Sequence, residues 1–145
     1  MGTARPAPSP RPGLPLSPAD RKDPAVRREL SGPALRAFFN IATAWGLSVT
    51  EARGLLGWPP LSTFHKYKSG AHGTLPYDTL TRLSLLLGIY KALQILYPEP
   101  LFSDRWPRMP NSNGLFGGRP PLEVMVDAGL DGLYQVRRLL DSRRG

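Results

Sequence analysis

The chain has 145 residues, 41% of them hydrophobic, so it can bury one modest core or two small ones and is too short for a large multidomain protein. The absence of cysteine excludes disulfides, thiolate metal sites and cysteine nucleophiles, and it fits a reducing cytoplasm. A formal net charge of +8 favours polyanionic partners, because clustered Lys and Arg side chains displace counterions from phosphates. A generically basic soluble protein would carry the same charge, so charge alone assigns no function.

Residues 1–32 are rich in proline and basic residues and contain almost no aromatic or β-branched side chains. Such a segment cannot bury enough apolar surface to offset the entropy lost on ordering. We therefore expect a disordered Pro/Arg-rich N-terminal tail over 1–32. A helix around Asp23 to Leu30, with Pro24 at its first position, is the alternative for the end of this tail.

Three short helices are expected to follow the tail. Apolar residues recur at helical spacing over 33–45, and Gly46 ends that segment. Ser48 and Glu51 form a capping-box pattern at the start of a second helix of little more than two turns. The third helix, over 61–69, is amphipathic.

Residues 76–97 then predict one long helix that is apolar over most of its circumference. Such a helix is covered on more than one side, here by the preceding helices and by either the C-terminal segment or a second copy of the chain. The side chains on which we base a homodimer prediction are Leu83, Leu86, Leu87, Tyr90 and Leu93. The most apolar stretch, over 83–97, is too short for a membrane span, so no membrane association is expected.

Residues 98–145 are expected to form a smaller helical half. The segment 98–120 is rich in Pro, Gly and Asn but carries isolated large apolar side chains, which indicates a packed irregular connection. A short helix is expected to begin at Pro121 and to end at Gly129. A last helix is then expected to turn Leu130, Leu133, Val136 and Leu140 inward, with Arg137 and Arg138 on its outer side.

The two helices within 48–67 have the size of a DNA-binding helix-turn-helix, whose second helix enters the major groove. Hydroxyl groups at the start of that helix can reach bases or phosphates, and lysines supply positive charge. The candidate DNA-binding residues are Ser62, Thr63, His65, Lys66 and Lys68. The alternative is that Ser62 or Thr63 only caps the helix and that the lysines are ordinary surface residues.

No catalytic or metal site is expected. Neither His65 nor His72 has a partnering cysteine or a suitably spaced acid with which to share a metal ion. The carboxylate pairs that could act as acid and base are Asp127 with Asp131 and Asp104 with Glu99, and they occupy cap and turn positions. We therefore expect a binding protein without a cofactor, and not an enzyme.

The C-terminal residues resemble the toxin-binding domain of Xre/MbcA/ParS antitoxins. The segments that carry the resemblance, in order, are Trp106-Pro-Arg-Met-Pro110-Asn111, Leu115-Phe-Gly117, Pro121-Leu122-Glu123-Val-Met125, Gly129-Leu130, Gly132-Leu133, Val136-Arg137 and Leu140. Upstream, 33–97 resembles the Xre-like helix-turn-helix half of the same family, including a Ser/Thr-rich helix that ends in an aromatic residue, a basic residue and Gly70. Two departures from the family pattern are the proline-rich turn over 57–60 and the long N-terminal tail.

The resemblance implies an all-α protein with a helix-turn-helix half over 33–97 and a toxin-binding half over 98–145. It implies a type II antitoxin of the bacterial cytoplasm. Such a protein blocks the active site of a RES-domain toxin, an enzyme that consumes NAD or transfers a group from it. It also represses its own operon by binding operator DNA. The toxin-binding residues it suggests are Trp106, Asn111, Arg137, Arg138, Arg143, Arg144 and Gly145. Two alternatives remain, a stand-alone helix-turn-helix transcription regulator and a small enzyme.

Overall fold

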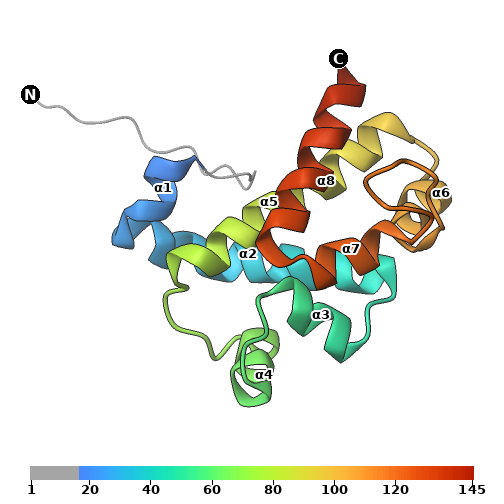
Figure 1. The fold of residues 1–145 in the computed structure, drawn as a ribbon. Helices are drawn as coiled ribbons and strands as arrows, with labels where there is room; N and C mark the ends of the chain where they lie inside the picture. Colours follow the sequence, from blue (N-terminus) through green and yellow to red (C-terminus); the bar gives the residue numbers. More distant parts are fainter. Residues whose placement is uncertain (1–16) are drawn as a thin grey trace, which may run out of the picture.

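In the computed structural model, which describes residues 17–145, every regular element is a helix (Figure 1). The predicted all-α class is therefore confirmed. The elements in chain order are α1 (Pro18–Lys22), α2 (Pro24–Trp45), α3 (Val49–Leu55), α4 (Leu61–Ser69), α5 (Tyr77–Leu96), α6 (Pro100–Arg105), the 3-10 turn η1 (Trp106–Arg108), α7 (Pro121–Asp127) and α8 (Gly129–Arg144).

The tail expected over 1–32 is helical from residue 18 onward, and its first sixteen residues lie outside the described part of the chain. Ser17 and Asp20 form a reciprocal capping box at α1, and the Asp23 side chain accepts a hydrogen bond from the Ala25 N–H at the start of α2. Helix α2 begins at Pro24, as the alternative anticipated, and continues through Pro33. Polar caps, which a search for apolar anchors does not weigh, order this segment.

Polar contacts also attach this segment to the rest of the protein. The Arg27 guanidinium donates hydrogen bonds of 3.0 Å to the carbonyl oxygens of Arg21 and Lys22. Ser31 is buried, and its Oγ accepts a hydrogen bond of 2.9 Å from the Leu75 N–H, just before α5. The helix-turn-helix half therefore begins well before residue 33.

Helices α2, α3 and α4 follow the three predicted helices, and their ends have the expected caps. Gly46 ends α2 in the left-handed conformation, with φ of 63°. Ser48 and Glu51 form the predicted capping box, in which the Ser48 Oγ accepts from the Glu51 N–H and the Glu51 carboxylate accepts from the Ser48 N–H. The turn between α2 and α3 is therefore positioned by local sequence signals.

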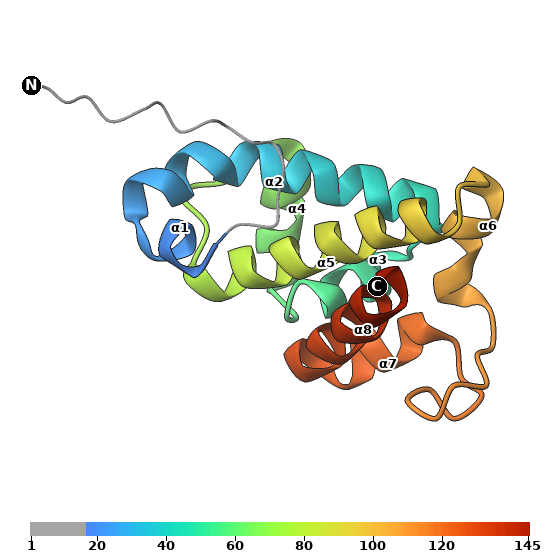
Figure 2. The ribbon, with the colours of Figure 1, turned by 90° about the horizontal axis from the view of Figure 1, so that it is seen from above.

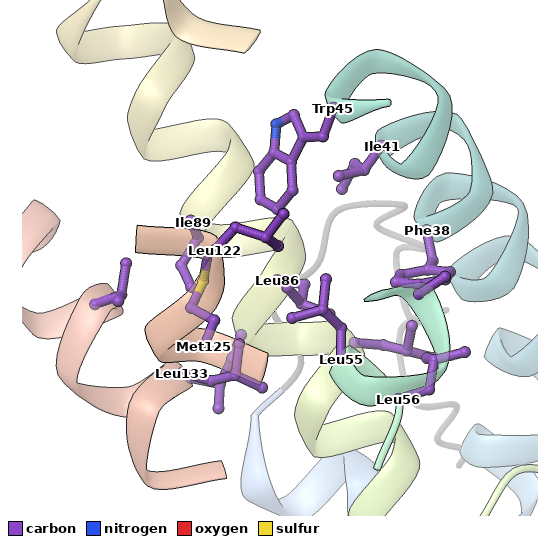
Figure 3. Packing of buried hydrophobic residues seen from close by; sticks show 14 of the residues in the cluster. Phe38, Ile41, Trp45, Leu55, Leu56, Leu86, Ile89, Leu122, Met125 and Leu133 are labelled. Atoms are coloured by element: carbon purple, nitrogen blue, oxygen red, sulfur yellow. The ribbon is translucent and has the colours of Figure 1, made fainter. Parts of the chain in front are cut away.

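Helix α5 is the central element, with α2 on one side and α8 on the other (Figure 2). Its side chains meet those of α2, α3, α7 and α8 in one continuous core (Figure 3). Leu83, Leu86 and Leu93, on which the homodimer prediction was partly based, are fully buried within the chain itself. Leu87 and Tyr90 are the members of that set that remain partly exposed.

At 20 residues, α5 is longer than the apolar stretch recognised in the sequence, and its length and mean hydropathy would suit a membrane span. Most of its apolar side chains are buried against neighbouring helices, which is typical of the central helix of a helical core.

The connection over 98–120 is packed, as predicted, but it also contains the helical segments α6 and η1. Trp106 and Phe116 pack edge to face with ring centroids 5.9 Å apart, and both are buried. The Asn111 side chain accepts a hydrogen bond from the Asn113 N–H, and the Asn113 side chain accepts one from the Leu115 N–H. These contacts hold the loop between η1 and α7 against the core.

Candidate functional site

Helix α4 presents a polar face on the outside of the protein. Phe64 is buried beneath it, whereas Ser62, His65 and Lys66 are exposed and Thr63 is half-buried. The helix N-cap is Pro60, and no side-chain hydrogen bond caps it. Ser62 and Thr63 are therefore not capping residues, which removes the structural alternative considered for these two hydroxyls.

Lys68 lies on a different part of α4 from Lys66. With about 100° between successive residues of a helix, Lys66 lies opposite the buried Phe64 and Lys68 lies on the flank. On that flank Lys68 lines a groove between α2 and α4. The five candidate DNA-binding residues thus share one short helix, with Lys66 at the centre of its outer face and Lys68 beside α2.

The turn between α3 and α4 is fixed by backbone contacts. Gly57 and Trp58 both have positive φ, at 90° and 63°, and Trp58 is the one non-glycine residue among those described with a positive φ. The Trp58 N–H donates to the Arg53 carbonyl at 2.8 Å, and the Arg53 Nε donates to the Pro59 carbonyl at 3.0 Å. The proline-rich turn therefore sets a definite start for α4 at Leu61.

Trp58 and Leu61 are about half exposed and were not recognised as surface residues from the sequence. The Trp58 indole lies over Gly54, where an added Cβ would come within 2.9 Å of it and within 2.8 Å of Val126 in α7. This glycine lets α7 and the tryptophan approach α3 closely. A glycine in the last turn of the short helix was the available signal, but its neighbours could not be identified without the fold.

Arg108 connects the two halves of the chain. From η1, its guanidinium donates to the carbonyl oxygens of Trp45 at 2.7 Å and Gly46 at 2.5 Å, and it forms an ion pair of 2.7 Å with Glu51. The hydrogen bond from Arg108 holds the pKa of the Glu51 carboxyl below its ordinary value, and partial burial only partly opposes this. The start of the helix-turn-helix is thus attached to the C-terminal half.

The toxin-binding candidates occupy four kinds of position. Trp106 is 4% exposed and belongs to the core, so it supports the surface from beneath. Asn111 is half-buried and shapes its own loop. Arg137 was expected on the outer side of α8, but its side chain lies against α5 and forms an ion pair of 3.0 Å with Asp141.

The remaining candidates lie on the exposed side and end of α8. Arg138 stacks near the ring of Tyr134, 6.0 Å from its centroid. Arg143, Arg144 and Gly145 follow Leu140, the last buried apolar residue, and are exposed. Figure 1 shows this end of α8 on the opposite side of the molecule from α4. The two candidate surfaces are therefore well separated.

An exposed apolar patch lies beside the end of α8 and was not predicted. Its members are Leu101 and Phe102 of α6, which are 69% and 43% exposed. The ring of Phe102 lies 5.0 Å from that of Tyr97, and the Tyr97 hydroxyl is 3.5 Å from Nη1 of Arg143. The patch continues into the basic end of α8 only because α5 and α8 pack together, and no local sequence signal shows this.

Within residues 17–145, no group of three or more His, Asp or Glu side chains is arranged to hold a metal ion. Asp104, considered as a catalytic candidate, lies beside Tyr90, and burial together with this negative charge raises the pKa of the Tyr90 hydroxyl. Asp127 forms an ion pair with Arg119, and the Asp131 side chain accepts a hydrogen bond from Gln135. Asp127 and Asp131 are thus engaged in structural contacts, whereas Oδ1 of Asp104 is buried without a hydrogen-bond partner.

Comparison with known proteins assigns both halves of the chain. Residues 24–88 match the antitoxin Xre-like helix-turn-helix domain, and residues 92–145 match the antitoxin Xre/MbcA/ParS C-terminal toxin-binding domain. An uncharacterised protein, y4oB, of Sinorhizobium fredii (strain NBRC 101917 / NGR234) is 46% identical over 111 residues, which cover 77% of this chain and 84% of that protein. No solved structure matches the chain. The first match begins at the first residue of α2, in agreement with the helical start at Pro24. The chain belongs to the Xre/MbcA/ParS family of antitoxins, with a helix-turn-helix domain followed by a toxin-binding domain.

Proposed function

We propose that this antitoxin neutralises a RES-domain toxin by blocking the active site of that toxin, which consumes NAD or transfers a group from NAD. We further propose that it represses its own operon through DNA contacts of α4. The toxin-binding domain implies a toxin as partner. The RES type of that toxin and the NAD chemistry are taken from the family resemblance.

The observation that carries the toxin proposal is the end of α8. Leu140 is fully buried, and beyond it the helix continues with Arg143 and Arg144, which the core does not need. A toxin that uses NAD must accommodate an anionic pyrophosphate, and a guanidinium is a planar, permanently charged group suited to the same electrostatic environment. The apolar patch beside it, with Phe102, supplies area for docking.

The DNA proposal is supported by the exposed face of α4. Ser62, His65 and Lys66 are free of the core, and the short helix is presented by a conformationally defined turn. Replacing Lys66 with Gln should reduce the affinity for operator DNA and flatten its salt dependence, because each lost phosphate contact lowers the log-log slope by about 0.9. Toxin binding should be unchanged in the same variant.

A homodimer remains part of the proposal, with a surface smaller than the sequence indicated. Leu87 and Tyr90 line a cleft of about 290 Å³ between α5 and α2, together with Ala37, Asn40 and Ile41. A second chain that covers this cleft would bring two α4 helices into one assembly, as dimeric helix-turn-helix proteins do on paired half-sites.

The decisive experiment is co-expression of this chain with the product of the adjacent reading frame, followed by pulldown, growth measurement and an assay of NAD loss with purified proteins. Formation of a complex, restored growth and suppressed NAD loss are the expected results. An adjacent protein that lacks a RES domain, or one that is not bound, contradicts the proposal and favours the stand-alone regulator.

A further inference from the structure

A basic groove lies between α2 and the C-terminal end of α4, and we call it the α2–α4 groove. It has a volume of about 390 Å³. Its lining residues are Gly32, Leu35, Arg36, Phe39, Asn40, Tyr67, Lys68, Ser69, Gly70 and His72. None of them is acidic, and Arg36, Lys68 and His72 can each carry positive charge. The lining therefore favours an anion.

Gly32 creates the space at one end of the groove. A Cβ atom at this position would lie 3.2 Å from Nη1 of Arg36 and 3.5 Å from Nε2 of His72. The guanidinium and the imidazole edge thus converge on the same point of the α2 backbone. The other ring nitrogen of His72, Nδ1, is 2.9 Å from the Gly73 carbonyl oxygen, which can only accept, so Nδ1 donates there. Nε2 is left for the groove, where it donates to an anion in the imidazolium form of the ring.

The groove has an apolar floor. Leu35 is buried, and the Phe39 ring packs against Phe64 of α4 with centroids 5.6 Å apart. This packing holds α2 and α4 at a fixed separation, and the apolar surface reduces the water available to screen charges at the rim. Arg36 and Lys68 are themselves exposed, so an extended polyanion can reach them from outside.

The groove is also in the right place for DNA. It borders the flank of α4, while the outer face of the same helix carries Lys66. A duplex that receives this outer face in its major groove brings a sugar-phosphate strand along each side of the helix. We infer that the α2–α4 groove holds a backbone phosphate of the DNA bound by α4, with Arg36, Lys68 and His72 as its contacts. This inference rests on the proposed DNA binding and adds a sequence-independent contact to it.

The test uses the full-length protein and a 24-base-pair duplex of arbitrary sequence, titrated by fluorescence anisotropy across a range of salt concentrations. Arg36→Gln removes one charge from the groove, and Arg36→Lys keeps it. Arg105→Gln removes an exposed arginine from α6, outside the groove, and is the matched control. We expect R36Q to lower the log-log salt slope by about 0.9 and the affinity near 0.1 M salt by roughly eightfold. R36K and R105Q should retain the wild-type slope.

A second measurement separates DNA phosphate from free phosphate. Inorganic phosphate is titrated into the protein while the resonances of His72 are followed by NMR. One contrary result is that phosphate shifts the His72 resonances of the wild type saturably while R36Q keeps the wild-type salt slope for duplex binding. That result would assign the groove to a free anion and overturn the inference. A wild-type salt slope in R36Q without any phosphate-induced shift of the His72 resonances overturns the inference as well. A wild-type protein that binds no duplex at low salt contradicts the proposed DNA binding itself, and the inference with it.

Discussion

Gly88 of α5 lies directly beneath the Arg137 side chain of α8. A Cβ atom added at Gly88 would overlap Nη1 of Arg137 and lie 2.5 Å from its Cζ. Arg137 is also paired with Asp141, and its side chain is 20% exposed. The absence of a side chain at position 88 therefore allows the central helix and the last helix to pack closely with a guanidinium between them.

This relationship predicts non-additive effects of substitution. Gly88→Ala should stabilise α5 by about 1 kcal/mol through helix propensity, but Arg137 must then leave its position. In an Arg137→Ala background the methyl group has room, so the gain in free energy of unfolding should appear in full. Urea denaturation of the two single variants and the double variant measures the coupling. An equal effect of G88A in both backgrounds would show that the two side chains do not compete.

The Gly88–Arg137 contact illustrates what the sequence could predict and what it could not. Helical periodicity located α3, α4 and α5 because their caps and apolar faces are encoded within a few residues. The position of Arg137 depends on how α8 crosses α5, a relation between residues far apart in the chain. Periodicity placed it outside, whereas a glycine on the facing helix accommodates it.

Some residues of the candidate site could likewise be predicted from the sequence, and others could not. Local patterns identified the exposed face of α4, including Lys66. Motif resemblance selected Trp106, whose burial shows that a residue typical of the domain serves its core. The α2–α4 groove and the patch at Phe102 arise where separate helices meet, so they required the fold.

The ion pair between Arg108 and Glu51 predicts a pH-dependent contribution to stability. The pKa of Glu51 is lowered from its ordinary value of 4.5 in the folded protein. The pair therefore stabilises the fold above that ordinary value, and the contribution is lost as the pH falls through the lower, folded-state pKa. In Arg108→Gln, the free energy of unfolding should fall less steeply between about pH 5 and pH 3 than in the wild type.

Urea unfolding at several pH values checks this, with Glu51→Gln as the control, because glutamine keeps an oxygen for the Ser48 N–H and loses the charge. Both variants should flatten the dependence, and E51Q should flatten it more, because in R108Q the hydrogen bonds from Ser48 still lower the pKa of Glu51. Parallel curves for the wild type and R108Q would mean that the ion pair makes no net contribution, as is common for exposed pairs.

The proposed homodimer predicts that Leu87→Glu produces a monomer. Leu87 is partly exposed at the cleft between α2 and α5, and a carboxylate there would have to be desolvated against apolar side chains of the partner. Ile95→Glu changes an exposed apolar residue of the same helix outside the cleft and should leave the dimer intact. Light scattering at micromolar concentration distinguishes the two. A monomeric wild type, or a dimeric L87E, rejects this interface.

The last prediction concerns the end of α8. A chain that stops after Asp141 keeps Leu140 in the core and retains the ion pair between Arg137 and Asp141. It loses Arg143 and Arg144, which are exposed, and with Arg143 it loses the contact of 3.5 Å with the Tyr97 hydroxyl. Folding and DNA binding should therefore be unchanged, because α4 lies on the opposite side of the molecule. Protection of cells that express the partner toxin should be abolished.

The variant that replaces both arginines with glutamine tests charge separately from length. If guanidinium groups occupy the pyrophosphate environment of the toxin, this full-length variant should fail as the truncated chain does, since glutamine is neutral and cannot form bidentate charged contacts. Arg138→Gln changes an arginine nearer the middle of α8 and should weaken docking without abolishing inhibition. Suppression of NAD loss by the truncated chain in a purified assay would show that inhibition comes from another part of the domain, for which the apolar patch with Phe102 is the next surface to test.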